Sequence, residues 1–355
     1  MLDQIIGQER AKRIMASAVR GERVHHAWIF SGPMGVGKHS AAIAFAAMLL
    51  DDTTAPDLMG ELAPDPESRT QQLIRSGAHP DMHLIDKDLA AYSDDRAVRE
   101  RKRMTIPKAV IDEHLLGPIA LAASVKTDAM AGKVFIIDEA ERLDRSVNNA
   151  PTQASMLKTL EEPPAGSVII LVTSSEDRLL PTIRSRCQRV VFTRLSDDEM
   201  EQWLSSTGLE VSGTEREWVL RYAEGSPGRA ALAVETGLFA WEQQLAPMLA
   251  QADSGRFPVE LGSTMQSLID DWAKEKVKRE PHESKEAANR EAAGLLMSLL
   301  ATRLRGRLRA NADDAQAIGR TLVGIDAIRD AERHIASNVN LQFATERLAS
   351  ALSGA

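Results

Sequence analysis

The residues Gly32-Pro33-Met34-Gly35-Val36-Gly37-Lys38 join an apolar run at 27–31 to an apolar helical run at 39–50. Glycines in such a loop let the backbone curl so that successive N–H groups face an anion, and the dipole of the following helix adds to the attraction. The lysine at the end of the loop would reach the β- and γ-phosphates of a nucleotide. The stretch therefore predicts a strand, a phosphate-binding loop and a helix. The expected nucleotide-binding residues of the loop are Gly32, Gly35, Gly37 and Lys38.

The residue after the loop departs from the usual pattern. Phosphate-binding loops of this kind continue with Ser or Thr, whose hydroxyl ligates Mg²⁺, but this chain has His39. An imidazole is a poor ligand for this hard, oxygen-seeking cation. Ser40 comes one residue late and would point about 100° away around the helix. We therefore expect a loop that can surround phosphates but has a damaged metal site.

Near-continuous apolar runs alternate with helical stretches through the first half of the chain, which is typical of a parallel sheet covered on both faces. The expected strands are residues 27–31, 82–86, 134–138, 168–173 and 188–192. After residue 192 the strand pattern stops, and helical periodicity continues to the end. We predict an α/β phosphate-loop domain over 1–193, a small helical lid over 194–239 and a helical C-terminal domain over 240–355.

Polar side chains follow two of the expected strands. Asp138 and Glu139 come at the carboxyl end of a buried strand, where the ligands of open α/β sheets bind. In an ATPase, Asp138 would belong to the Mg²⁺ shell and Glu139 would orient the attacking water. Thr173 ends another strand, where its hydroxyl could sense the γ-phosphate. The alternative for all three residues is an ordinary polar loop after a strand.

Composition limits the class of protein. The 355 residues are 43% hydrophobic and 26% charged, with a net charge of −8, which is a normal globular balance. A single cysteine, Cys187, excludes a disulfide scaffold and a thiolate zinc cluster and fits a reducing compartment. The longest apolar run, 41–50, is too short to cross a bilayer. No signal peptide is evident, so we expect a cytoplasmic protein.

The most specific stretch of the sequence is 179–188, which contains Ser185-Arg186-Cys187. Together with Leu157-Lys158-Thr159-Leu160-Glu161-Glu162-Pro163-Pro164, it resembles the clamp-loader branch of the AAA+ proteins, and the triplet is similar to that family's SRC motif. In the family this arginine reaches across a subunit boundary to the ATP of its neighbour. The resemblance therefore implies that Arg186 is an arginine finger acting in trans, a role that suits an always-charged, bidentate guanidinium. The alternative is a solvated surface charge.

Further motifs narrow the resemblance to the delta-prime subunits of bacterial DNA polymerase III. Matching stretches occur at 25–28, 77–81, 225–228 and 338–341. The resemblance implies an AAA+ parallel-sheet domain, a helical lid and a C-terminal helical collar that joins subunits. It also implies partners: gamma/tau-type ATPase subunits and a delta subunit, with the sliding clamp and primed DNA reached through the complex.

The chain also departs from that family in three places. Residues 51–78 contain no cysteine, so we predict no zinc where relatives usually carry a four-cysteine module. About five extra residues around 147–152 include Pro151, which is poorly tolerated inside a helix, so we expect the next helix to start after it. Motor subunits of the family place a γ-phosphate-sensing arginine where this chain has Gly228, with Arg229 one residue later.

These departures favour a stator that is not catalytic alone but completes a neighbour's ATP site within the polymerase III holoenzyme. One alternative is an active gamma/tau-like ATPase motor, since Lys38, Asp138 and Glu139 are intact. Another is a structural relic that binds no nucleotide. The sequence therefore leaves both alternatives for its own loop, with and without bound ATP and Mg²⁺. The arginine clusters at 96–103 and 303–309 are expected to be solvated rather than phosphate-tracking, because their charges are diluted or split between helix faces.

Overall fold

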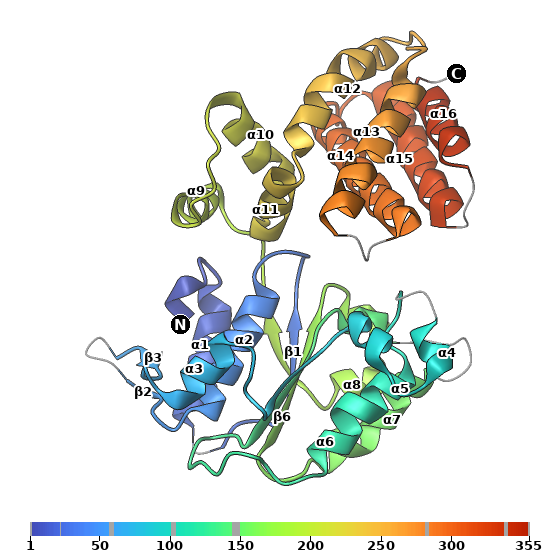
Figure 1. The fold of residues 1–355 in the computed structure, drawn as a ribbon. Helices are drawn as coiled ribbons and strands as arrows, with labels where there is room; N and C mark the ends of the chain where they lie inside the picture. Colours follow the sequence, from blue (N-terminus) through green and yellow to red (C-terminus); the bar gives the residue numbers. More distant parts are fainter. Residues whose placement is uncertain are drawn as a thin grey trace. The chain divides into compact units, whose positions relative to one another are not determined.

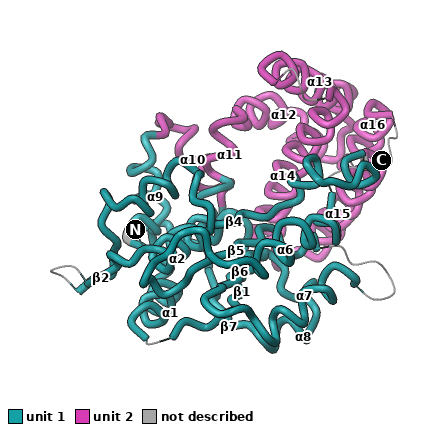
Figure 2. Tube along the Cα trace, turned by 60° about the horizontal axis from the view of Figure 1, so that its bottom comes forward, with its two compact units in different colours: residues 1–208, 224–229 teal, residues 209–223, 230–355 magenta. Residues whose placement is uncertain are grey.

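The computed structural model describes all residues except 1, 22, 57–59, 101–103, 144–149, 281–283, 337–339 and 354–355. It divides the chain into two compact units, residues 1–208 with 224–229 and residues 209–223 with 230–355 (Figure 2). The boundaries predicted at 193 and 239 stay a prediction. Half of the extra residues around 147–152, and half of the motif at 338–341, lie outside the described residues.

A parallel five-stranded sheet forms the centre of the first unit (Figure 1). The strand order is β4-β5-β6-β1-β7, and every neighbouring pair is parallel. The strands are β1 (Ala27–Ser31), β4 (Met82–Ile85), β5 (Lys133–Ile137), β6 (Ser167–Thr173) and β7 (Gln188–Val191). All five predicted strands are present within a residue at either end, which confirms the α/β fold class. A small antiparallel pair, β2 (Ala55–Pro56) and β3 (Leu62–Ala63), lies apart from this sheet.

Alternate residues of the strands face two separate hydrophobic cores, because side chains of a strand point to opposite faces of the sheet. Trp28 and Phe30 pack with α1 (Glu9–Arg20) and α2 (Lys38–Leu50). Ile29 packs on the other face, which is covered by α5 (Lys108–Ile111), α7 (Pro151–Glu161) and α8 (Pro181–Arg184) (Figure 1). Burying one such large apolar side chain contributes about 1.5–3 kcal/mol, so the helices fix both faces of the sheet.

Short helical segments complete the first unit. The remaining ones are η1 (Leu2–Gln4), α3 (Arg69–Arg75), η2 (Lys87–Tyr92), α4 (Arg96–Arg99), η3 (Asp112–Leu116), α6 (Gly117–Ile119), η4 (Ala140–Arg142), η5 (Glu176–Arg178) and α9 (Asp197–Ser206). The helix expected to start after Pro151 instead starts at it, since Pro151 is the first residue of α7. The N–H that proline lacks would have no partner within the helix at this first position. Ser196 is the N-cap of α9 and forms a full capping box with Glu199.

The cysteine-free segment after α2 is organised by one carboxylate. Asp51 accepts hydrogen bonds from Thr53 Oγ1 at 2.6 Å, Ser68 Oγ at 2.5 Å and Gln71 Nε2 at 2.8 Å. Burial works to raise the pKa of Asp51, but these hydrogen bonds hold it below its ordinary value. The ionised side chain therefore joins the end of α2 to the short helix α3.

The second unit is entirely helical among its described residues. Its helices are α10 (Gly213–Ala223), α12 (Leu238–Asp253), α13 (Leu261–Arg279), α14 (Lys285–Ala310), α15 (Ala315–Ala336) and α16 (Leu341–Leu352), and α11 (Pro227–Glu235) continues into it. Arg303 and Arg307 are half-buried and both pair with Asp253. The expectation of a solvated face is therefore wrong for these two residues. No helix in the described part of the chain is long and apolar enough to span a bilayer.

Candidate functional site

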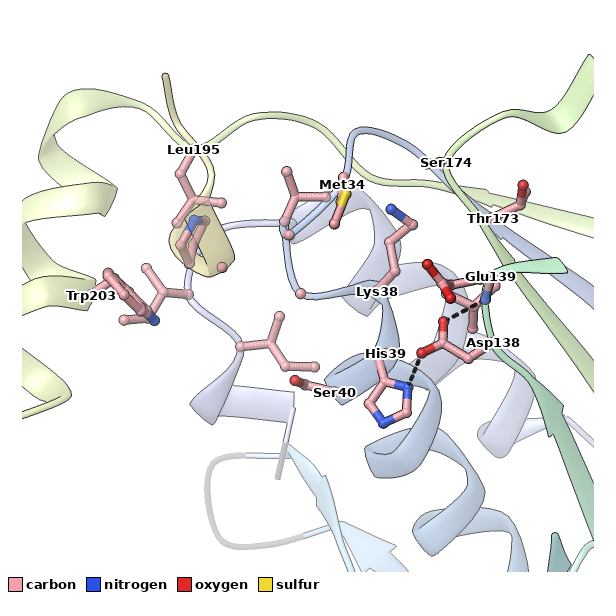
Figure 3. A pocket seen from close by; sticks show the side chains of 18 of the residues that line it. Met34, Lys38, His39, Ser40, Asp138, Glu139, Thr173, Ser174, Leu195 and Trp203 are labelled. Atoms are coloured by element: carbon pink, nitrogen blue, oxygen red, sulfur yellow. Dashed lines mark hydrogen bonds and ion pairs between the residues drawn. The ribbon is translucent and has the colours of Figure 1, made fainter. Parts of the chain in front are cut away.

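A cavity of about 500 Å³ lies at the carboxyl edge of the sheet (Figure 3). Parallel strands end at the same edge, so the loop after β1 and the polar residues after β5 and β6 meet there. The predicted residues that line the cavity are Gly35, Gly37, Lys38, Asp138, Glu139 and Thr173. Gly32 lies just behind this lining, and its carbonyl oxygen accepts a hydrogen bond from Lys38.

Lys38 is bonded to its own loop. Its Nζ atom donates to the carbonyl oxygens of Gly32 at 2.7 Å and Pro33 at 2.5 Å. Burial lowers the pKa of Lys38 from its ordinary value, although the charges of Glu141 and Asp138 oppose the shift. The lysine thus closes the phosphate loop on itself, and a phosphate would have to displace both carbonyl contacts.

His39 occupies the position of the missing hydroxyl and pairs with Asp138, its Nδ1 atom lying 2.8 Å from Oδ2 (Figure 3). The contact with Asp138 raises the pKa of His39 and outweighs burial, which would lower it. Burial works to raise the pKa of Asp138, but the hydrogen bond and charge of His39 hold it below its ordinary value. The carboxylate that would face Mg²⁺ therefore faces an imidazole.

These residues do not fit a magnesium ion. Mg²⁺ requires oxygen ligands in octahedral geometry, and the loop supplies an imidazole where an oxygen is needed. The one carboxylate at the expected place is paired with that imidazole at 2.8 Å. An imidazole thus contacts the carboxylate that a divalent cation would need.

Glu139 is held between two basic side chains. Lys87 Nζ lies 2.6 Å from its Oε2 atom, and Arg142 Nε lies 2.9 Å from Oε1. The backbone of Glu139 has φ 46°, a left-handed conformation that costs a residue with a side chain of order 1 kcal/mol. Sequence reasoning missed both partners. Lys87 stands just past the carboxyl end of β4, and that position could have indicated it.

The hydroxyls after β6 bond to Glu141, another residue that sequence reasoning missed. Thr173 Oγ1 donates to Glu141 Oε2 at 2.9 Å, and Ser174 donates through both its backbone N–H and its hydroxyl. Burial works to raise the pKa of Glu141, but these hydrogen bonds keep it below its ordinary value. The expected γ-phosphate sensor is therefore already partnered within the chain.

The start of α11 rests directly on the phosphate loop. The backbone N–H of Gly228 donates to the carbonyl oxygen of Gly35 at 2.8 Å, and Ser226 Oγ donates to that of Met34 at 2.9 Å. A Cβ atom on Gly228 would lie 2.8 Å from the Gly35 Cα atom, so this seating requires glycine. Arg229 pairs with Glu224 at 2.9 Å.

Arg186 lies at the opposite edge of the sheet from the phosphate loop. It precedes β7, whose first residue Gln188 is in register with Trp28 near the start of β1. At about 3.3 Å per residue, six strand positions separate it by about 20 Å from the loop. Arg186 Nη1 donates to the Thr182 carbonyl at 2.8 Å, and Nη2 pairs with Glu161. The structure therefore does not bring Arg186 to the other predicted residues.

Cys187, next to Arg186, is an unreactive thiol. Burial raises its pKa to about 12, against the opposing charge of Arg189. At neutral pH almost none of it is thiolate, the form that acts as a nucleophile. Cys187 is therefore a packed small residue rather than a nucleophile.

Comparison with known proteins identifies relatives for more than half of the chain. Residues 7–196 match the family model described as DNA polymerase III, delta subunit. The DNA polymerase III subunit delta' of Bacillus subtilis is 29% identical over 197 residues, 56% of this chain and 51% of that protein. The tau subunit of the same organism is 29% identical over 227 residues, 63% of this chain and 35% of that protein.

A solved structure also aligns with nearly all of the chain. It is a DNA polymerase III gamma subunit-related protein from Thermotoga maritima, 17% identical, with 98% of each chain covered and a TM-score of 0.46. By contrast, the sequence match to the delta' relative spans about half of that protein's length.

Proposed function

The chain belongs to the DNA polymerase III delta subunit family, and we propose that it is a delta-prime-like clamp-loader subunit. It would act as a stator, a subunit that hydrolyses ATP weakly or not at all and supplies Arg186 to the ATP site of a neighbour. Its partners would be gamma/tau-type ATPase subunits and a delta subunit. The assembled complex would load the sliding clamp on primed DNA.

The observation that carries the proposal is the pairing inside the chain's own cavity. His39 is paired with Asp138, and Lys87 and Arg142 are both paired with Glu139. In an ATPase the first carboxylate serves the metal and the second the attacking water. Asp138 and Glu139 must each break an ion pair within the chain before they can take up these roles. This supports a subunit that does not hydrolyse ATP by itself.

The position of Arg186 supports a role in trans. A guanidinium side chain reaches about 7 Å from its Cα atom, whereas the chain's own loop is about 20 Å away along the strands. Arg186 is one-third exposed and lines a surface hollow with Glu161 and Gln188. Arg186 therefore cannot reach a phosphate bound in this chain's own loop, and a phosphate that contacts it has to be bound by another subunit.

An active gamma/tau-like motor is the second candidate. The intact residues Lys38, Asp138 and Glu139 favour it, as does the similarity to a tau subunit. A motor would turn over ATP in the purified chain, and Lys38→Ala would abolish that turnover. A stator would show no turnover above background with or without the substitution.

The decisive experiment is ATP turnover by the reconstituted complex in the presence of clamp and primed DNA. Arg186→Ala is expected to slow turnover at the neighbouring site on the order of a thousandfold. Arg184→Ala is the matched control, because Arg184 is the last residue of α8, two positions before Arg186, and pairs with Asp177. Lys38→Ala is expected to leave turnover unchanged. Wild-type turnover by a fully assembled Arg186→Ala complex would contradict the trans role.

A further inference from the structure

The guanidinium of Arg186 is held by contacts of two kinds. Its Nη1 atom donates to the carbonyl oxygen of Thr182 at 2.8 Å and to Ser185 Oγ at 3.4 Å, and both of these partners are close to it in sequence. Its Nη2 atom donates to Glu161, which lies 25 residues earlier. Among the described residues, Glu161 is therefore the only partner that ties this guanidinium to a different element of the fold.

Glu161 is the last residue of α7, a helix that is anchored near both ends. Near its start, Gln153 accepts a hydrogen bond from the backbone N–H of Leu180, the N-cap of α8, at 2.7 Å. Near its end, the carbonyl oxygen of Leu160 lies 2.9 Å from His26 Nε2, one residue before β1. The side chains of Gln153 and Leu160 are buried. The carboxylate is therefore carried by a helix that is fixed against both the sheet and α8.

Glu161 also sets the charge of the hollow that surrounds Arg186. The hollow has a volume of about 520 Å³, and of its described lining residues Glu161 is the only carboxylate and Arg186 the only arginine or lysine. Their side chains are 50% and 33% exposed. An ion pair as exposed as this one contributes little to folding, and both of its groups stay accessible to a partner molecule.

The guanidinium has N–H groups to spare while it is held. Arginine carries five side-chain N–H donors. Within the part of the chain that the structure describes, the contacts with Thr182, Ser185 and Glu161 use three of them. The remaining donors are enough for a bidentate contact with phosphate oxygens. Glu161 can thus hold the side chain in one orientation without leaving it when a phosphate arrives.

We propose that Glu161 is the positioning residue for Arg186, and that it keeps the guanidinium in the orientation in which it meets the γ-phosphate bound by a neighbouring subunit. The inference rests on the proposed trans role of Arg186. A free arginine side chain samples many rotamers, and ordering it during the reaction would cost their entropy. An ion pair with a fixed helix orders it before the neighbour's ATP arrives, which lowers the barrier to hydrolysis.

The test measures ATP hydrolysis by the reconstituted complex with clamp and primed DNA, using rapid quench so that the chemical step rather than product release is followed. Glu161→Ala is expected to lower the maximal rate about three- to tenfold. The ATP concentration at half-maximal rate should change by less than about twofold, because the guanidinium acts in the transition state. Glu161→Gln keeps a hydrogen-bond acceptor at the same place and should restore most of the rate.

Glu162→Ala is the matched control. Glu162 follows Glu161 directly and is likewise exposed, but the described residues offer its carboxylate no ion-pair partner. Its removal should leave the maximal rate and the half-saturating ATP concentration unchanged. Size-exclusion chromatography of each complex separates a failure to assemble from a failure to hydrolyse ATP.

Combining the two substitutions separates this inference from the trans role itself. If Glu161 acts only through Arg186, Glu161→Ala should cause no further loss in the Arg186→Ala complex. A further loss there, or an unchanged rate for Glu161→Ala when Arg186→Ala is slow, would overturn the positioning role and leave the trans role standing. A faster rate for Glu161→Ala would also overturn it, since Glu161 would then mask the guanidinium. A wild-type rate for Arg186→Ala would overturn both.

Discussion

At the scale of single residues, His39 changes what its neighbours can do. A hydroxyl at this position would leave Asp138 available to a metal ion, whereas the imidazole pairs with that carboxylate at 2.8 Å. The exchange removes an oxygen ligand and adds a titratable base in one step. The stability of the first unit should therefore depend on the protonation of this pair.

We predict that the contribution of the His39–Asp138 pair varies with pH. The pKa of His39 is raised above 6.5, so its stabilisation is complete below that pH and is lost as the pH rises through the folded-state pKa. The pKa of Asp138 is lowered below 3.8, so its stabilisation is present above that pH and lost as the pH falls through the lower folded value. The pair should contribute most between these two limits.

A double-mutant cycle in denaturant measures this contribution, using His39→Ser, Asp138→Asn and both together. The coupling energy is expected to be roughly 0.5–1 kcal/mol at about pH 5.5, because the pair is partly exposed, and smaller at about pH 8.5. A coupling energy that is equal at the two pH values would show that the imidazole is not titrating against Asp138.

At the scale of elements, the contact between the phosphate loop and α11 depends on two glycines. Gly35 has φ 75°, and a Cβ there would lie 2.5 Å from Ser226 Oγ. Gly228 faces it with its own backbone N–H bonded to the Gly35 carbonyl. The arginine that motor subunits carry at this place could not be accommodated without moving the helix.

We predict that Gly228→Ala lowers the free energy of unfolding of the first unit by about 1–3 kcal/mol, because the added methyl group would meet backbone rather than a flexible side chain. Gly294→Ala is the matched control, since nothing lies within 4 Å of the added Cβ atom in α14. That change should stabilise its helix by about 0.5–1 kcal/mol. Urea unfolding of the two variants measures whether the free energy of unfolding falls for Gly228→Ala and rises for Gly294→Ala. An unchanged free energy of unfolding for Gly228→Ala would show that α11 does not pack on the loop.

The sequence could predict elements whose signal is local. The strands could be predicted because each is a short buried apolar run. The start of α7 was predicted one residue late, because proline is tolerated at the first position of a helix. Side-chain pairs such as Arg307 with Asp253 could not be predicted, since they join residues distant in sequence. Lys87, a partner of Glu139, was missed for the same reason: it lies 52 residues away and comes close only when β4 and β5 pair.

At the scale of the whole molecule, the hydrophobic cores divide in the same way as the two units. Ile170 and Leu171 belong to the two cores that sandwich the sheet. Leu296 and Leu300 belong to a third core, built from residues 222–349 of the second unit. Each unit thus has its own source of stability, and the chain need not unfold in a single step.

We predict that truncating a core residue destabilises only the unit that contains it. Leu296→Ala and Leu171→Ala are a matched pair, because both side chains are completely buried leucines, and each change should cost about 2–5 kcal/mol. Hydrogen exchange followed by mass spectrometry measures the rate of amide exchange in both units in one experiment. Leu296→Ala should speed exchange in α13, α14 and α16 and leave β1 and β6 protected, and Leu171→Ala should do the reverse. Faster exchange throughout the chain in either variant would mean that the two cores unfold as one cooperative unit.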